Sequence, residues 1–199
     1  MAIANTLPAF TAEEYLAQER AASFKSELID GRIVAMAGAS RAHNVVAFNI
    51  LGELRPQLKG RRCEAYGSDM RVEIAAAGLY TYPDASVVCG QPRFGDAHGD
   101  TLQNPTVIFE ILSPTTEAYD RGEKFARYRR LDSLEAYVLV SQAEMRVEWY
   151  TRQPGSGTWL YNAVEGGEAT VALASIGCTI ALREVYDKVW DDVLSGVRR

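Results

Sequence analysis

Two apolar, strand-like segments each carry one acidic residue. Asp84 lies in the segment from Tyr82 to Cys89, and Glu110 lies in the segment from Val107 to Leu112. An ionised carboxylate that is buried without a partner is strongly unfavourable, so each acid needs a cation or a hydrogen-bond network. Two such carboxylates on neighbouring strands repel each other unless a divalent cation neutralises them, and hard oxygen ligands suit Mg²⁺ or Mn²⁺. The pattern therefore predicts a metal site inside a sheet.

The first half of the chain predicts helices and a hairpin. Thr11 and Glu14 form a capping box that starts a helix ending near Ala22. Residues 27–36 read as two short strands around an Asp-Gly turn. A second helix is expected after Ser40, with one apolar face made of Val45, Phe48, Leu51 and either Leu54 or Leu58.

The second half predicts more strands and two further helices. Strand-like segments cover residues 63–75 and 136–140, and alternating strands start near Met145 and Trp159, joined by a hairpin turn at 153–157. Residues 120–131 are expected to be helical, with Phe125 and Tyr128 on one side, and a last helix is expected over about 182–194. This mixed order predicts an α/β or α+β fold with a central mixed sheet flanked by helices.

Bulk properties restrict the class of protein. A length of 199 residues fits one domain. The sequence has no run of eighteen apolar residues, so it predicts no transmembrane helix. The net charge of −5 argues against a nucleic-acid packaging protein, although basic clusters exist. Three widely spaced cysteines, Cys63, Cys89 and Cys178, are interpreted as unpaired thiols, which with the lack of a secretory signal indicates a cytoplasmic protein.

Lys124 belongs to the helical segment that follows the second acidic strand. It can reach back over the end of the sheet and stabilise charge on an attacked phosphate, or help to deprotonate a water. Two acidic metal ligands and one lysine suffice for metal-assisted phosphodiester hydrolysis. The residues alone leave other interpretations open: Pro83-Asp84 as a turn, Glu110 paired with an arginine, and Lys124 as a solvated lysine.

The segment Glu110-Ile111-Leu112-Ser113-Pro114-Thr115-Thr116, followed by Asp120, Lys124, Tyr128 and residues 136–140, resembles the Uma-two family of bacterial restriction-endonuclease-like proteins. Pro83-Asp84 and Glu27-Leu28-Ile29-Asp30-Gly31 followed by His43 match as well. The resemblance runs from Thr11 to about Trp190. It implies one restriction-endonuclease-like domain over residues 1–199, with a core at about 11–190 and extra antiparallel strands.

The resemblance also implies site residues. Asp84, Glu110 and Ile111 are expected to hold Mg²⁺ or Mn²⁺. The wider superfamily has its lysine two positions after the second acid, where this chain has Leu112, so Lys124 is the candidate for a displaced lysine. Glu27 is expected to complete the site, against the alternative of a surface residue. His43 contacts phosphate or assists proton transfer, or else is an ordinary residue of the first helical turn.

Two functions follow from this resemblance. The first is a metal-dependent endonuclease that hydrolyses DNA with metal-activated water. The second is an inactive nuclease-fold module that binds nucleic acid or a protein partner. A homodimer is a further expectation, because two symmetric sites can cut both strands of a duplex. Its contact surface would be the aromatic residues Trp149, Tyr150, Trp159 and Tyr161, which are alternatively a sheet face over a small core.

Overall fold

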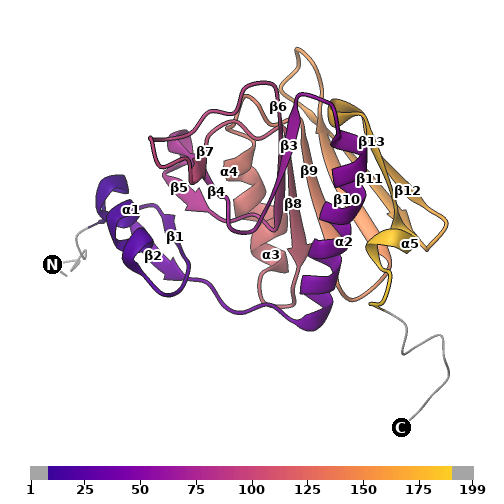
Figure 1. Ribbon diagram of the computed structural model, residues 1–199, viewed down its shortest axis with the longest axis horizontal. Helices are drawn as coiled ribbons and strands as arrows, with labels where there is room; N and C mark the ends of the chain where they lie inside the picture. Colours follow the sequence, from indigo (N-terminus) through magenta and orange to yellow (C-terminus); the bar gives the residue numbers. More distant parts are fainter. Residues whose placement is uncertain (1–8, 190–199) are drawn as a thin grey trace, which may run out of the picture.

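A central six-stranded sheet organises the molecule (Figure 1). The computed structural model describes residues 9–189. Strands β8 and β9 are parallel and every other neighbouring pair in this sheet is antiparallel, so the sheet is mixed, as predicted. In spatial order its strands are β11 (Trp159–Glu165), β10 (Arg146–Arg152), β9 (Ala136–Ser141), β8 (Val107–Leu112), β6 (Ala85–Cys89) and β3 (Cys63–Gly67).

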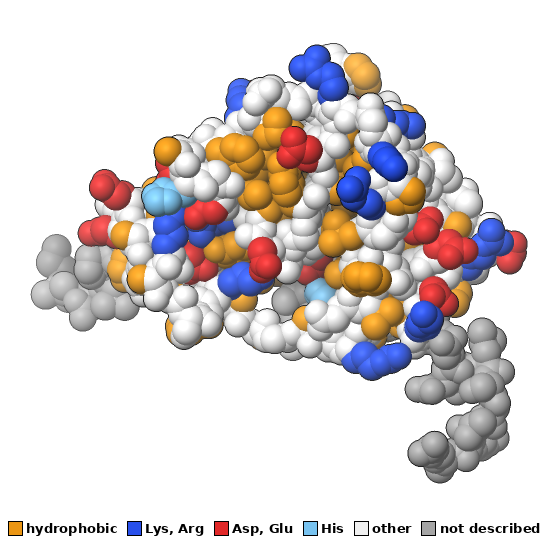
Figure 2. Space-filling view, in the orientation of Figure 1, with side chains coloured by type: hydrophobic (Ala, Val, Ile, Leu, Met, Phe, Trp, Pro, Cys, Tyr) orange, Lys and Arg blue, Asp and Glu red, His pale blue; other side chains and the backbone are white. Residues whose placement is uncertain are grey.

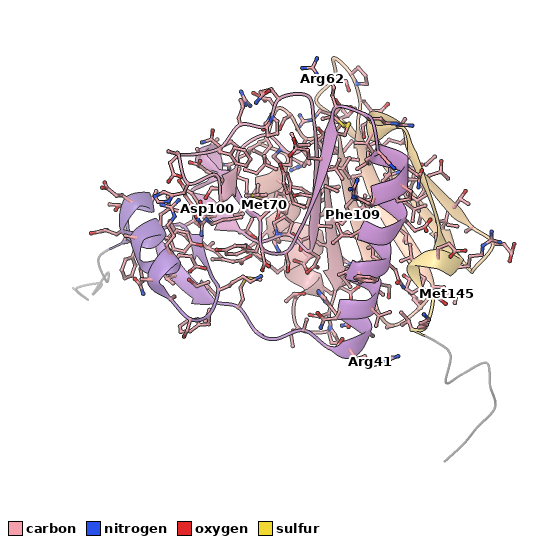
Figure 3. The ribbon with its side chains drawn as sticks, in the orientation of Figure 1. Arg41, Arg62, Met70, Asp100, Phe109 and Met145 are labelled. Carbon is pink, nitrogen blue, oxygen red and sulfur yellow. A yellow bond between two sulfur atoms is a disulfide. The ribbon has the colours of Figure 1, made fainter. Side chains whose placement is uncertain are left out.

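Helix α2 (Arg41–Leu58) covers one face of this sheet. It begins directly after Ser40, as predicted, and the Ser40 hydroxyl caps it by accepting a hydrogen bond from the backbone N–H of His43. Its buried residues, spaced four apart, pack on alternate β8 residues such as Phe109, which Figure 3 shows between helix and sheet. These residues are Val46, Ile50, Leu54 and Leu58.

The predicted apolar face of α2 is therefore wrong in part. Phe48 is 76% exposed, and Val45 and Leu51 are only partly buried. The same layer contains strands β12 (Thr170–Leu173) and β13 (Cys178–Ala181), which the sequence reading missed, and helix α5 (Leu182–Val185). The predicted final helix is confirmed over Leu182–Val185 only, because residues 186–189 form turns, and its expected end near residue 194 lies outside the described residues.

The other face of the sheet is covered by a short helical segment. It consists of α3 (Glu117–Tyr119), a π-helix (Asp120–Lys124) and α4 (Phe125–Tyr128). As predicted, Phe125 and Tyr128 face inward, where they pack with apolar residues of β8 and β9. β8 alternates between the two faces, and its residues 107, 109 and 111 point to the α2 side. Glu110 consequently belongs to the face covered by α3 and α4.

A second, five-stranded sheet has the order β2-β1-β5-β4-β7. Helix α1 (Ala12–Ala21) packs beside it and starts at Thr11 with the predicted capping box. The predicted hairpin is confirmed: Asp30 and Gly31 both have positive φ, which the tight turn between β1 and β2 requires. The strands are β1 (Ser26–Ile29), β2 (Arg32–Ala35), β4 (Arg71–Ile74), β5 (Leu79–Thr81) and β7 (Thr101–Leu102).

Two predicted strands are each interrupted. The segment 63–75 forms β3 and β4, which belong to different sheets. The segment 82–89 becomes a strand only at Ala85, because Pro83 cannot donate a hydrogen bond to a sheet ladder. Asp84 therefore lies at the start of β6, where the chain passes from one sheet to the other.

The cysteines are not all unpaired, which corrects the sequence reading. Cys63 and Cys89 lie opposite each other on β3 and β6 and form a disulfide, whereas Cys178 is a free, buried thiol. The cytoplasmic expectation drew on unpaired thiols and loses that support. Within residues 9–189 no helix is both long and apolar enough to cross a bilayer. Acidic and basic side chains are interspersed on the face shown in Figure 2.

Candidate active site

Asp84 and Glu110 come together where β6 begins and β8 approaches its end. The last paired residues of these strands are Ala85 and Phe109, so the next positions, Asp84 and Glu110, are neighbours on the same side of the sheet. The backbone N–H of Ile111 donates to Asp84 Oδ2 at 2.7 Å. The two acids therefore converge, as their predicted shared role requires.

Lys124 joins Glu110 from the π-helix above it. Lys124 Nζ lies 2.9 Å from Glu110 Oε1, and the Tyr128 hydroxyl donates to the same oxygen at 2.8 Å. Lys124 is only 6% exposed, so it is not a solvated lysine. Glu110 is likewise paired with this lysine and not with an arginine.

Glu27 and His43 also belong to the cluster. Glu27, on β1, is buried, accepts a hydrogen bond from the Thr81 hydroxyl, and lies 3.8 Å from Lys124 Nζ. His43 Nε2 lies 2.8 Å from Asp84 Oδ1, reaching the site from the first turn of α2. The structure thus brings all five predicted side chains together from both sheets and two helical segments.

Asp120 and Tyr128 are site residues that sequence reasoning placed in the family motif without a role. Asp120 Oδ1 lies 3.6 Å from Lys124 Nζ, and Asp120 is 3% exposed. The i,i+4 spacing of Asp120 and Lys124 was the available signal, because it puts two residues on one helix face. Asp120 and Lys124 both lie in the π-helix, a distortion that is frequent at functional sites.

The cluster contains four acidic side chains and one lysine. Burial raises the pKa of Glu110 well above its ordinary value; Lys124 opposes this rise, and Asp84 and Asp120 add to it. Burial likewise raises the pKa of the Asp120 carboxyl. Burial would lower the pKa of Lys124, but Glu110, Glu27 and Asp120 together raise it, so the ammonium keeps its proton. One ammonium thus lies near three carboxyl groups, those of Glu27, Glu110 and Asp120, while Asp84 contacts His43.

The oxygen donors fit a hard divalent cation. Asp84 and Glu110 offer carboxylates, and Ile111 can offer only its backbone carbonyl, which in a strand points to the same side as its N–H, toward Asp84. Among residues 9–189 no three His, Cys, Asp or Glu side chains form a metal-binding group. Mg²⁺ is commonly held by one or two carboxylates while it keeps several waters, so this small donor set is compatible with it.

Glu148 is another buried acid, and it lies in the same cross-strand row of the six-stranded sheet as Glu110. Leu139 pairs with Glu110 on one side and with Glu148 on the other. Glu148, on β10, is 4% exposed and binds Arg121 at 2.5 Å and Arg146 at 3.0 Å. Burial would raise the pKa of Glu148, but hydrogen bonds from Tyr161, Arg146 and Arg121 lower it overall. Glu148 is therefore fully paired within the protein.

The aromatic residues near β10 and β11 mainly cover the core. Tyr150 and Trp159 contact Phe125, with ring centroids 4.3 and 5.4 Å apart, and Trp149 packs on the α2 side. Of the four aromatic residues that the sequence analysis offered as a dimer contact, Tyr161 is the exposed one, at 46%. The interpretation as a sheet face over a core describes these strands better than a free aromatic contact surface, and the homodimer stays a prediction.

Comparisons with known proteins agree with this fold. The family model Uma2, described as "Putative restriction endonuclease", matches residues 12–183. Two uncharacterized proteins of Synechocystis sp. are 37% identical over 171 residues and 35% identical over 179 residues. The first match covers 86% of this chain and 96% of the relative, and the second covers 90% and 92%.

A solved structure shares the fold. It is described as a putative nuclease belonging to DUF820 from Anabaena variabilis, and it superposes with a TM-score of 0.70 at 17% identity. The match covers 90% of this chain and 99% of that one. By its sequence match and its restriction-endonuclease-like architecture, this chain belongs to the Uma2 family of putative restriction endonucleases.

Proposed function

We propose that this protein is a Mg²⁺- or Mn²⁺-dependent endonuclease that hydrolyses phosphodiester bonds of DNA. The observation that carries the proposal is the convergence of Asp84 and Glu110 at the ends of neighbouring strands, in a cluster with one ammonium and four carboxylates. Membership of a family described as putative restriction endonucleases supports the nuclease class. The choice of DNA, and of these metals, belongs to the proposal.

Asp84, Glu110 and the Ile111 carbonyl would hold the ion. When bound, a divalent cation stabilises developing negative charge on phosphate oxygens and lowers the pKa of a bound water. Its double charge also offsets the excess of carboxylates. Under this proposal, the acids Asp84 and Glu110 occupy an otherwise unfavourable environment because they bind the metal.

The chain's own residues have separate parts in the proposal. His43 fixes the Asp84 carboxylate through the contact at Oδ1, while the Ile111 N–H fixes the other oxygen. Lys124 keeps its positive charge and stabilises the negative charge that develops on the attacked phosphate. Glu27, held by Thr81, orients water beside Lys124.

The test combines metal binding with cleavage. Calorimetry with Mn²⁺ and a plasmid-cleavage assay with Mg²⁺ or Mn²⁺ are carried out on the wild-type protein and on Asp84→Asn and Glu110→Gln. We expect the wild type to bind Mn²⁺ and to cut, and both variants to lose cleavage by at least about 100-fold, because each lacks a charged ligand. Asp132→Asn, an exposed acid outside the cluster, is the matched control.

The same experiment addresses the inactive binding module. Leu112 at the usual lysine position favours that alternative. A wild type that leaves plasmid intact with either metal, yet binds labelled DNA or RNA equally well before and after Asp84→Asn, contradicts the nuclease and supports the module.

A further inference from the structure

The π-helix that carries Lys124 is attached to three neighbouring strands of the six-stranded sheet. Strands β8, β9 and β10 each make a polar contact with its five residues. In strand order the contacts are Glu110 to Lys124 Nζ at 2.9 Å, the Tyr137 hydroxyl to the Asp120 backbone carbonyl at 2.9 Å, and Glu148 to Arg121 Nη1 at 2.5 Å. The contact with β10 therefore holds the same short segment from which Lys124 reaches Glu110.

Glu148 is a fixed point for this attachment, because partners on its own sheet hold it as well. Arg146 lies 3.0 Å from the Glu148 carboxylate, and the Tyr161 hydroxyl donates to it. A hydrogen bond to a charged group is roughly twice as strong as a neutral one. Because Glu148 is buried, water does little to weaken its ion pair with Arg121. Arg121 is further aligned by Glu117, which lies 2.8 Å away on α3.

The π-helix itself has little local order that could fix Lys124. Gly122 lies in the middle of this segment, and glycine in a helix interior loses more conformational freedom on folding than any other residue. A Cβ atom at Gly122 would meet no packed neighbour within 4 Å, so packing does not require a glycine there. Contacts with the sheet, more than local ones, therefore decide where Lys124 lies.

We propose that Arg121 and Glu148 are positioning residues of the candidate site: their ion pair fixes the π-helix on the sheet so that the Lys124 ammonium stays beside Glu110. This inference rests on the proposed function, in which Lys124 stabilises the charge that develops on the attacked phosphate. Neither residue has to meet the substrate, so the burial of Glu148 is no obstacle to this role. A shift of about 1 Å in a group that acts on the reacting atoms can cost about 100-fold in rate.

Arg121→Gln and Arg146→Gln form a matched pair of variants. Each removes one arginine from the same carboxylate, but only Arg121 belongs to the π-helix. Their side chains are 33% and 29% exposed, so both variants should fold. For cleavage of a labelled DNA duplex with saturating Mn²⁺, we expect kcat of Arg121→Gln to fall by about 10-fold or more, with KM within about 2-fold of the wild type. Arg146→Gln should keep kcat within about 2-fold, because Glu148 then still holds Arg121.

Two further readouts separate positioning from a merely structural role. Arg121→Lys keeps a positive charge opposite Glu148 and should recover most of the lost kcat. Calorimetry with Mn²⁺ should show that Arg121→Gln binds the metal as tightly as the wild type, because Asp84 and Glu110 are unchanged. A structural arginine would instead lower the melting temperature in both glutamine variants and leave kcat unchanged in both.

A double-mutant cycle measures the coupling without any cleavage. Glu110→Gln removes the charge that Lys124 contacts, and it is combined with Arg121→Gln in urea unfolding without divalent metal. If the ion pair positions Lys124, the unfolding constant of the double variant should deviate from additivity by at least about 3-fold, as it does for residues of one network. The same cycle with Arg146→Gln should be additive within about 2-fold.

The outcomes separate the two claims. If the wild type cuts, Asp84→Asn does not, and Arg121→Gln keeps the wild-type kcat, the positioning role is overturned and the nuclease stands. Equal losses of kcat in Arg121→Gln and Arg146→Gln overturn it too, as does an additive cycle. If the wild type cuts with neither metal, the proposed function falls, and the cycle alone decides whether the ion pair fixes Lys124.

Discussion

At the scale of single residues, Lys124 is the cation on which three buried carboxylates depend. It lies 2.9 Å from Glu110, 3.6 Å from Asp120 and 3.8 Å from Glu27. Removing one partner of a buried ion cluster leaves uncompensated charge. The cost is therefore larger than that of losing an exposed salt bridge, which contributes little.

Lys124→Met should accordingly destabilise the fold by about 3–5 kcal/mol. The measurement is the free energy of unfolding in urea at neutral pH, without divalent metal. Lys59→Met, at an exposed lysine, is the control and should change stability by no more than about 0.5 kcal/mol. Equal stability of Lys124→Met and wild type would show that the cluster does not need this charge.

The sequence predicted which residues come together in the candidate site, but not the contacts that they make there. Asp84 and Glu110 were detectable because a carboxylate in an apolar strand is costly, and the motif spacing added Lys124, Glu27 and His43. The contacts themselves were not predictable. Tyr128 approaches Glu110 only because a π-turn sets the direction of the following helix, and no local pattern encodes that turn.

At the scale of elements, the disulfide links β3 to β6, the strand that follows Asp84. Cys63 and Cys89 are 26 residues apart, and their pairing depends on strand register, which sequence spacing does not reveal. Closing a loop of this length stabilises a fold by about 3.5 kcal/mol in the chain-entropy model.

Reduction should therefore lower the melting temperature of the wild type. Cys63→Ala/Cys89→Ala should melt near the reduced wild type and be insensitive to reductant. Cys178→Ala serves as the control that keeps the disulfide. Mass spectrometry of the alkylated, unreduced protein should detect one free thiol, and three free thiols would contradict the pairing.

Arg20 fastens α1 to the loop before β7, and this link should depend on pH. Its guanidinium lies 2.8 Å from Asp100 and 2.7 Å from Asp96, and Figure 3 shows Asp100 beside α1. Hydrogen bonds from Arg20 are the largest cause that lowers the pKa of both carboxyls below the usual 3.8. A lowered folded-state pKa stabilises the fold above the unfolded value, and this stabilisation is lost as pH falls through the folded value.

Arg20→Gln should thus melt below the wild type at pH 7, and the difference should shrink as pH falls below about 4. Thermal melts across pH 2.5–7 are the measurement. Arg62→Gln, at an exposed arginine between α2 and β3 and away from Asp100 in Figure 3, should show no such trend. A difference that stays constant with pH would mean that Arg20 acts through packing alone.

The elements that could be predicted are those specified by short sequence motifs. The Thr11 capping box and the Asp30-Gly31 turn each lie within a few residues, so the structure confirms them. The apolar face of α2 was misjudged because hydrophobic residues occur nearly all round its first turns. Contact with β8, not periodicity, selects Val46 and Ile50 over Phe48. The alternation in β10 concealed Glu148 because its arginine partner arrives from a distant helix.

At the scale of the whole molecule, the two sheets meet at the site and share its unfavourable charge. Glu27 lies on β1 of the five-stranded sheet, Glu110 lies on the inner strand β8 of the six-stranded sheet, and Asp84 directly precedes its strand β6. An ion that binds only the folded state stabilises it by RT ln(1 + [L]/Kd), which is about 2.7 kcal/mol at 100 times Kd.

Saturating Mn²⁺ should therefore raise the melting temperature of the wild type by roughly 5–10 °C, since 1 kcal/mol corresponds to about 2–4 °C in a protein of this size. Asp84→Asn removes one proposed ligand and should abolish most of the rise, whereas Asp132→Asn should keep it. Ca²⁺ at equal ionic strength tests whether another hard divalent ion produces the same rise. NaCl at equal ionic strength controls for screening of the charges. Because the carboxylates come from both sheets, the rise should appear as a single transition of the whole domain. A wild-type melting temperature that Mn²⁺ leaves unchanged, at concentrations up to several millimolar, would mean that Lys124 alone compensates these acids and that the site needs no metal to fold or to bind.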